Sequence, residues 1–327
     1  MRLVSIGGGT GLSTLLRGLK EKVGKEITDL SAVVTVADSG GSTGKLRKLY
    51  NVPAPGDIRN CIVALSESEE IIRELFQFRF KGGELDGHAF GNLFLVALTE
   101  ITGSFMQAIN IASQILRTKG EIIPATLDNV QLCAEFSDGE RVCGEENITE
   151  YGKHKRARVK RIWIEPEDAK APIDAVAKIE SAHVIVFGPG SLYTSIVPNL
   201  LIKDIREAVL RPPAIRVFVV NAMTQPGETD DFTAYDHLKA FRECTGIDRL
   251  HVAIVNTKMP SDPVLRRYLA QRQEPVVPDV ARIAREEIEV YAEDLIGEKE
   301  DFVRHDPQRL ASIIMEIYKK NGILFRL

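Results

Sequence analysis

Five short segments rich in glycine and small polar residues recur along the chain, each next to the boundary of a predicted strand or helix. Strands that alternate with helices indicate parallel βαβ units. In an open parallel sheet every strand delivers its following loop to the same carboxyl edge, where ligands bind. Turns that are far apart in the sequence can therefore meet at one ligand the size of a nucleotide. The five segments are 7–11, 38–44, 55–57, 188–191 and 221–228.

The apolar runs have the length and composition of strands buried inside a sheet. The clearest is Leu30–Val36, a nearly continuous run rich in β-branched residues, as expected for a strand covered on both faces. Helical patterns dominate from Gly56 to Leu116. We therefore expect a Rossmann-like α/β fold, with a mostly parallel sheet and helices on both faces, formed by residues 1–327 as a single domain. The other expected strands are Leu3–Ile6, His183–Phe187, Ile215–Val220 and His251–Val255.

Residues 120–166 have a strand-like periodicity and predict a small β-rich insertion within this domain. The insertion is interpreted as a flap or as a surface on which two copies of the chain pair, so a homo-oligomer is one expectation. It contains the strongest basic run of the chain, Lys153–Arg161. This run is interpreted either as a solvated strand and turn or as a patch that steers phosphate ligands or an acidic partner.

Charge and composition argue against several classes of protein. The formal net charge is −4 and the pI is near 6.0, so no excess of basic charge indicates nucleic-acid binding. No apolar run approaches the roughly 20 residues that span a bilayer, and the first strand leaves no room for a signal peptide before it. We therefore expect a cytoplasmic protein. Its four cysteines lack C-x-x-C spacing and are expected to be reduced core or strand residues, although Cys133 and Cys143 could face each other across a hairpin.

The first glycine turn is the strongest candidate for a phosphate site. It lies between a strand and a helix, so main-chain N–H groups can point at an anion with the helix dipole behind them. Glycine lets the backbone approach phosphate oxygens closely. The turn is neither a regular G-x-G-x-x-G, because Leu12 occupies the third glycine position, nor a Walker A loop. A tight turn with a structural role alone is the alternative. The candidate residues are Gly8, Gly9, Thr10 and Gly11.

The second and third turns supply two carboxylates. Asp38 falls where a dinucleotide-binding fold places its ribose-binding acid, and the hydroxyl-rich loop after it can form an anion nest or a mobile linker. Asp57 is interpreted as a helix N-cap that also faces the site. Asp38 and Asp57 could jointly hold Mg²⁺ with substrate phosphates, although no metal is required. The other candidates from these turns are Ser39, Gly40, Gly41, Ser42, Arg59 and Asn60.

Three later segments add polar candidates. His88 stands ahead of an apolar helix, where a capping or core histidine is the alternative to a functional one. Two glycines around a proline, followed by hydroxyl residues, suit phosphate or sugar hydroxyls in 188–195. Amides suit sugar or base edges in 221–230, and an ordinary strand-to-helix connection is the alternative for both segments. The candidates are His88, Asn92, Gly188, Gly190, Ser191, Asn221 and Gln225.

Together these segments resemble the bacterial gluconeogenesis-factor family, a branch of the CofD-like 2-phospho-L-lactate transferase superfamily. The resemblance runs essentially from end to end and implies a Rossmann-like core in a cytoplasmic protein that binds UDP-sugars, notably UDP-N-acetylglucosamine. It also implies a need for the protein in cell shape and in growth on gluconeogenic carbon sources, through carbon flow into cell-wall precursors. A metabolic or cell-wall synthesis protein is the expected partner. The resemblance rests on 7–11, 37–42, 55–60, 88–93, 188–201, 221–230 and 303–306.

The resemblance adds two candidate ligand contacts late in the chain, Tyr268 and Arg304. Tyr268 could stack on uracil, and Arg304 could pair with the diphosphate. An aromatic residue on a helix face and a surface charge are the structural alternatives.

One departure bears on catalysis. The transferase branch more often carries paired aspartates for Mg²⁺ in its first acidic loop, whereas Ser39 follows Asp38 here. We therefore expect a nucleotide-sugar-binding regulator with no required cofactor and no assigned catalytic residue. An Mg²⁺-dependent transferase of phospho groups is the main alternative. A nicotinamide dehydrogenase is a weaker one, although such a cleft could accept NAD adventitiously.

Overall fold

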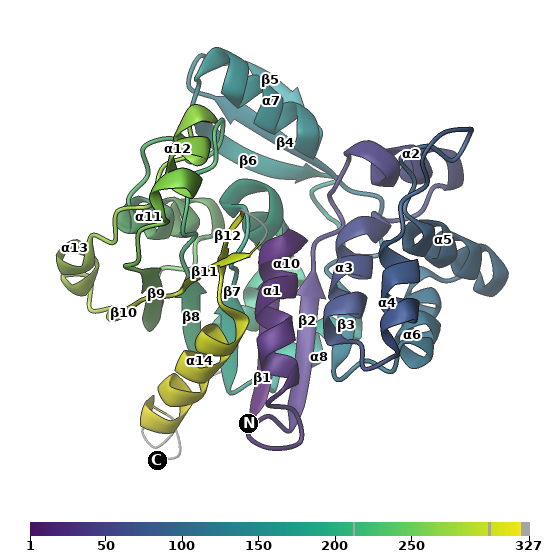
Figure 1. Cartoon of the computed structure of the whole chain (residues 1–327), viewed down its shortest axis with the longest axis horizontal. Coiled ribbons are helices and arrows are strands. Elements are labelled where there is room, and N and C mark those ends of the chain that lie inside the picture. Colours follow the sequence, from purple (N-terminus) through teal and green to yellow (C-terminus); the bar gives the residue numbers. More distant parts are fainter. Residues whose placement is uncertain (212, 300–301, 322–327) are drawn as a thin grey trace.

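The computed structural model describes residues 1–211, 213–299 and 302–321, and a seven-stranded sheet forms its centre (Figure 1). The strands are β1 (Arg2–Gly7), β2 (Asp29–Val34), β3 (Glu121–Pro124), β7 (Val184–Phe187), β8 (Ile215–Val219), β9 (Val252–Asn256) and β10 (Glu289–Glu293). Their order is β10-β9-β8-β7-β1-β2-β3, and every paired neighbour runs parallel. The predicted parallel sheet is therefore confirmed.

The strand order reverses at β1, which fixes the place of the site. β1 pairs with β2 on one side and with β7 on the other, so the connections that follow β1 and β7 leave the sheet in opposite directions. Such a switch point opens a crevice at the carboxyl ends of the strands. After Arg2 every residue of β1 is buried, as expected for a central strand of a parallel sheet.

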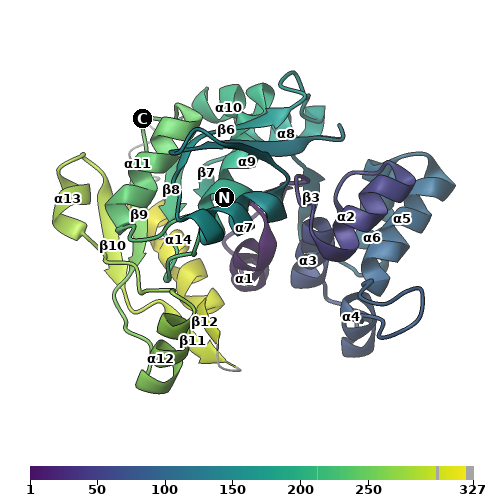
Figure 2. The same ribbon diagram turned by 90° about the horizontal axis from the view of Figure 1, so that it is seen from above.

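Helices cover both faces of the sheet, as predicted. They are α1 (Gly9–Lys20), α2 (Gly41–Tyr50), α3 (Pro55–Leu65), α4 (Glu70–Gln77), α5 (Phe90–Thr102), α6 (Phe105–Ile115), α7 (Glu145–Lys155), α8 (Ile173–Glu180), a π-helical turn (Leu192–Ile196), α9 (Val197–Leu201), α10 (Lys203–Leu210), α11 (Ala234–Thr245), α12 (Asp262–Ala270), α13 (Val280–Ala284) and α14 (Pro307–Asn321). α1, α3 and α14 lie on one face, and α8 to α11 lie on the other (Figure 2). In the described part of the chain no helix is long and apolar enough to cross a bilayer.

A small antiparallel sheet lies with α7 above the carboxyl edge of the main sheet (Figure 1). Its strands are β4 (Gln131–Phe136), β5 (Arg141–Cys143) and β6 (Val159–Glu165), in the order β5-β4-β6. The start of the predicted insertion differs, because β3 pairs with β2 in the main sheet. The basic run is divided between the end of α7 and the start of β6. Ile148 of α7 is buried in the main core, so the insertion is packed onto the domain.

Cys133 and Cys143 form a disulfide, so the expectation of four reduced thiols is wrong for this pair. The β4–β5 register places the two residues directly opposite each other, with their Cα atoms 4.0 Å apart. Cys61 and Cys244 carry free thiols. The other expectation, that these two cysteines face each other across a hairpin, is confirmed by this register.

An antiparallel hairpin near the end of the chain returns to its beginning. It consists of β11 (Ile296–Lys299) and β12 (Phe302–His305), and β12 packs against α1. α14 then packs along α1 (Figure 1). Arg304 is thereby brought to the same edge as the first glycine turn.

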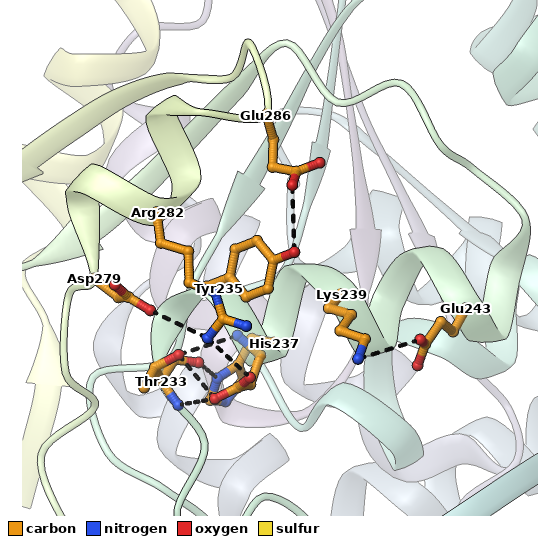
Figure 3. A network of polar contacts seen from close by, with 9 residues as sticks. Thr233, Tyr235, His237, Lys239, Glu243, Asp279, Arg282 and Glu286 are labelled. Atoms are coloured by element: carbon orange, nitrogen blue, oxygen red, sulfur yellow. Dashed lines mark hydrogen bonds and ion pairs between the residues drawn. The ribbon is translucent and has the colours of Figure 1, made fainter.

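A polar network joins α11 to α13 (Figure 3). Thr233 and Asp236 form a capping box, in which each side chain accepts a hydrogen bond from the other residue's main-chain N–H. Arg282 of α13 lies 3.9 Å from the centre of the Tyr235 ring and 4.0 Å from Asp236 Oδ1. The Tyr235 hydroxyl donates to Glu286 at 3.3 Å. These contacts fix the outer side of the sheet behind β9 and β10.

Candidate ligand-binding site

A cavity of about 500 Å³ lies at the carboxyl ends of β1, β7 and β8. Small-molecule sites commonly have volumes of about 300–1,000 Å³. The cavity is lined by turns that follow these strands, and α12 and β12 close one side of it. Ten of the predicted site residues meet here: Gly8, Gly9, Thr10, Gly11, Gly190, Ser191, Asn221, Gln225, Tyr268 and Arg304.

The turn after β1 provides the positive end of a helix. α1 begins at Gly9, and its N-cap Gly8 has no side-chain hydrogen bond to the helix. The first N–H groups of a helix have no intrahelical partners, so this turn suits an anion. A Cβ on Gly11 would lie 2.4 Å from the Pro189 oxygen. Only glycine therefore lets α1 pack this closely against the turn after β7.

The turn after β7 is held by hydrogen bonds to β1 and to the turn after β8. Gly188, at φ +77°, does not line the cavity, and its N–H donates to the Ile6 oxygen at 3.0 Å. The Gly190 N–H donates to Asn221 Oδ1 at 3.1 Å, and Asn221 Nδ2 donates to Gln225 Oε1 at 3.2 Å. Asn221 thus joins the turns after β7 and β8, and this contact holds the shape of the cavity floor.

A buried carboxylate, Glu228, organises the hydroxyl groups on one wall. It accepts hydrogen bonds from Ser191 Oγ and from Thr149 Oγ1, the latter at 3.0 Å. Ser191 Oγ also accepts from Thr194 Oγ1 at 2.7 Å. Burial raises the pKa of Glu228 above its ordinary value. The Ser191 hydroxyl is therefore already paired, and it shapes the wall through Glu228.

α7 adds two wall residues that the sequence analysis missed, Glu145 and Thr149. Burial raises the pKa of Glu145 to about 7, and the negative charge of Asp38 acts in the same direction. Glu145 lies in the acidic first turn of α7, and acidic residues at the start of a helix do not by themselves indicate a ligand site. Only the docking of the insertion onto the domain brings these side chains to the cavity. The α7 side of the cavity is therefore carboxylic, and the start of α1 contributes helix N–H groups.

The remaining candidates form a second polar cluster beside the cavity and do not line it. This cluster lies at the starts of α2, α3 and α5. Ser42 Oγ and His88 Nδ1 are 3.0 Å apart, and Asn92 Nδ2 donates to Ser42 Oγ at 3.4 Å. Arg59 Nη2 donates to Asn60 Oδ1 at 2.8 Å. The members of the cluster are Asp38, Ser39, Gly40, Gly41, Ser42, Asp57, Arg59, Asn60, His88 and Asn92.

Asp57 is the link between the cluster and the cavity. It is the third residue of α3, whose N-cap is Ala54, so the predicted N-cap role is wrong. Its carboxylate accepts the Gly9 N–H, and a Cβ on Gly8 would lie 2.5 Å from Asp57 Oδ2. Burial, and next the charge of Asp38, raise the pKa of Asp57 to about 7. The Asp57 carboxyl group thus lies next to the first glycine turn, and the charge of Asp38 disfavours its ionised form.

Asp38 and Asp57 fit a magnesium ion only together with a ligand. Within the described residues, neither belongs to a group of three His, Cys, Asp or Glu side chains whose ligand atoms all lie within 4.8 Å of one another. Mg²⁺ is usually bound through one or two carboxylates plus substrate phosphates and water. These two residues would hold the ion, and its charge would be shared with phosphate oxygens.

The far side of the cavity is formed by α12 and β12. The Tyr268 hydroxyl accepts the Val303 N–H at 2.9 Å, which fixes the ring at the cavity wall. Arg304 is exposed and lies 5.5 Å from the Phe302 ring, and no carboxylate in the described part of the chain forms an ion pair with it. Burial lowers the pKa of His305 to about 4, so this cavity residue is neutral at physiological pH. Arg304 therefore supplies the cationic charge of this wall.

Fold and site together define the class of the protein: a Rossmann-like α/β protein with a ligand cavity at the switch point of its parallel sheet. The family model described as 2-phospho-L-lactate transferase CofD matches residues 3–296. The gluconeogenesis factor of Bacillus subtilis (strain 168) is 43% identical over 98% of this chain and 98% of its own length. A relative from Aquifex aeolicus (strain VF5) that carries the gluconeogenesis-factor name is 64% identical over 97% of this chain and 96% of its own. The chain belongs to the CofD family, in the branch of the gluconeogenesis factors.

A solved structure shows the same fold. A crystal structure of a protein from Bacillus halodurans is 41% identical to this chain and superposes with a TM-score of 0.91. The match covers 96% of this chain and 99% of that chain. The predicted family and fold class are confirmed.

Proposed function

We propose that this chain is a regulatory protein that binds UDP-sugars, with UDP-N-acetylglucosamine as its ligand. In this proposal it is required for normal cell shape and for growth on gluconeogenic carbon sources, because it links central carbon metabolism to the supply of cell-wall precursors. The gluconeogenesis-factor name of its relatives supports the metabolic role. Its partner is a metabolic or cell-wall synthesis protein of the cytoplasm.

One observation carries the proposal: the start of α1 and Arg304 line the same cavity although they are far apart in the sequence. A diphosphate needs hydrogen-bond donors and positive charge. Helix N-terminal N–H groups supply the donors, and Arg304, which has no carboxylate partner among the described residues, supplies the charge.

The base and the sugar of a UDP-sugar can each contact a suitable part of the cavity wall. The Tyr268 ring is fixed through its hydroxyl and can stack on a pyrimidine base. Glu145 and Thr149 line the carboxylic α7 side and can hydrogen-bond sugar hydroxyls. A ligand with a flat base, a diphosphate and a polyhydroxylated end uses all three surfaces of this cavity.

The alternative is an Mg²⁺-dependent transferase of phospho groups, as the family model's description suggests. The observation that favours it is the position of Asp57 beside Gly8, with Asp38 close enough for its charge to raise the pKa of Asp57. Asp38 and Asp57 would hold the metal ion, and its positive charge would stabilise phosphate groups of a bound substrate. Mg²⁺-dependent consumption of a nucleotide-activated substrate would support this alternative.

A thermal-shift and calorimetric titration tests the proposal. At about 100 times its Kd, UDP-N-acetylglucosamine should stabilise the fold by about 2.7 kcal/mol. Arg304→Ala should lose this shift without unfolding, because it removes the cation of the diphosphate site. Arg285→Ala, an exposed arginine outside the cavity, is the matched control and should keep it.

Absence of a shift with every UDP-sugar tested would contradict the proposal. If NAD(H) is turned over and UDP-sugars are not bound, the dehydrogenase alternative holds instead. The physiological role is tested in a strain that lacks the gene. The wild-type chain should restore growth on a gluconeogenic carbon source, and Arg304→Ala should not.

A further inference from the structure

The Cys133–Cys143 disulfide lies on the outer face of the small sheet. Side chains alternate between the two faces of a strand, and Leu132 and Ala134 of β4 belong to the buried core. Cys133 therefore faces the other way. Cys133 is fully buried, whereas Cys143 on the edge strand β5 is half-buried. Cys143 is thus the more exposed of the two residues.

Two residues of β6 border this disulfide. Cys133 pairs in register with Trp163, the only tryptophan of the chain. The indole N–H of Trp163 donates to Glu165 Oε1 at 3.0 Å. A carboxylate oxygen of Glu165 and the Sγ atoms of both cysteines lie within 4.8 Å of one another. The tryptophan is therefore a built-in optical reporter of the state of the two sulfurs.

A single residue, Gly144, separates the disulfide from Glu145, which lines the ligand cavity. Gly144 follows Cys143 with φ +99°, and its N–H donates to the Leu132 oxygen at 2.8 Å. The next residue, Glu145, begins α7 and lines the cavity. The β4–β5 ladder has only three residue pairs. The cross-link therefore reinforces a short ladder at the point where the cavity wall begins.

We propose that Cys133 and Cys143 are a redox-modification site, at which thiol–disulfide exchange with a dithiol reductant changes the affinity of the cavity for its ligand. The thiolate of the reductant attacks Cys143 Sγ, the sulfur–sulfur bond breaks, and Cys133 leaves as a thiolate that takes a proton from water. The second thiol of the reductant then attacks the mixed disulfide. Cys143 is released as a thiol, and the reductant leaves as its own disulfide, so two electrons pass to the protein.

The oxidised form binds the ligand more tightly. The closed disulfide holds the start of α7, so Glu145 and Thr149 are already ordered before the ligand arrives. We expect reduction to weaken binding about fivefold, the lower end of ordinary coupling between two sites. This coupling rests on the proposed function, whereas the modification site itself does not.

Thiol counting and Trp163 fluorescence test the modification site on the full chain. After equilibration with oxidised glutathione, the denatured chain should expose two thiols, those of Cys61 and Cys244. After treatment with dithiothreitol it should expose all four. Trp163 fluorescence of the folded protein should rise on reduction, because a neighbouring disulfide quenches indole emission. Four thiols after the oxidising treatment would overturn the proposal.

Calorimetry in the two redox states tests the coupling. Oxidised wild-type protein should bind UDP-N-acetylglucosamine about fivefold more tightly than reduced wild-type protein. The double variant Cys133→Ser, Cys143→Ser should bind like the reduced protein and ignore dithiothreitol, whereas Cys244→Ser should behave like wild type. Equal affinity in both states of the wild-type protein overturns the coupling. Failure of both states to bind any UDP-sugar contradicts the proposed function, and the thiol count still decides the modification site.

Discussion

At the scale of single residues, the acidic groups beside the first glycine turn predict an unusual dependence of stability on pH. Burial and Asp38 raise the pKa of Asp57 to about 7, whereas its ordinary value is 3.8. The folded chain therefore holds this proton more tightly than the unfolded chain does. The free energy of unfolding should fall as pH rises from about 4 to about 7, and this contribution should be level above that range.

Replacing Asp57 should remove its own share of this slope, whereas Glu145, whose pKa is also raised to about 7, should keep its share. Asp57→Asn should match the wild type near pH 4 and be more stable by at least about 1 kcal/mol near pH 8, because each pKa unit corresponds to about 1.4 kcal/mol. Urea denaturation across this pH range measures the effect. Asp168→Asn, on the surface, should keep the wild-type slope. If the free energy of unfolding depended on pH in the same way for Asp57→Asn and wild type, Asp57 would not be the group that is protonated in the folded chain.

Residues also show where sequence reasoning reached its limit. Glycine spacing indicated the turns correctly because a tight turn depends on local backbone geometry. The partners of Ser191 and Asn221 were not predictable, because Glu228 and Gly190 reach them only after the strands have been ordered. Glu145 was missed for the same reason, since its place depends on how an insertion docks.

At the scale of elements, the contact between α1 and the turn after β7 holds the anion site together. Gly11→Ala would place a Cβ 2.4 Å from the Pro189 oxygen, so one of the two elements must move. We expect a loss of about 1–3 kcal/mol in the free energy of unfolding, the usual effect of overpacking. The affinity for UDP-N-acetylglucosamine should fall as well, because the start of α1 shifts.

Gly297→Ala is the matched control for that substitution. No atom of the described residues lies within 4 Å of the added Cβ, and the backbone there is not in the left-handed region. Urea denaturation and calorimetry of both variants give the comparison. If Gly11→Ala were as stable as Gly297→Ala and bound ligand equally well, the close packing of the two turns would have no role in the site.

Elements were the most predictable level of the fold. Apolar runs of four to seven residues indicated β1, β2, β7, β8 and β9 because strands buried on both faces need no polar alternation. β3 was assigned to the insertion, because the sequence of a short edge strand does not indicate which sheet the strand joins. The disulfide depends on the register between β4 and β5, which amino-acid composition does not specify.

At the scale of the whole molecule, the strand order explains why distant turns form one site. The reversal at β1 opens the crevice, and the hairpin of β11 and β12 returns Arg304 to it from the other end of the chain. The sequence predicted this convergence for ten residues. It did not predict that the candidates around Asp38 and Asp57 would stand beside the cavity, because they follow β2, on the other side of the switch point.

The most direct measurement of the central claim is a crystal structure of the full chain with UDP-N-acetylglucosamine. We predict diphosphate oxygens within about 3 Å of main-chain N–H groups at the start of α1 and of the Arg304 guanidinium. The base should lie against Tyr268 and the sugar toward Glu145. A diphosphate bound away from both α1 and Arg304, with this cavity filled only by solvent, would contradict the account.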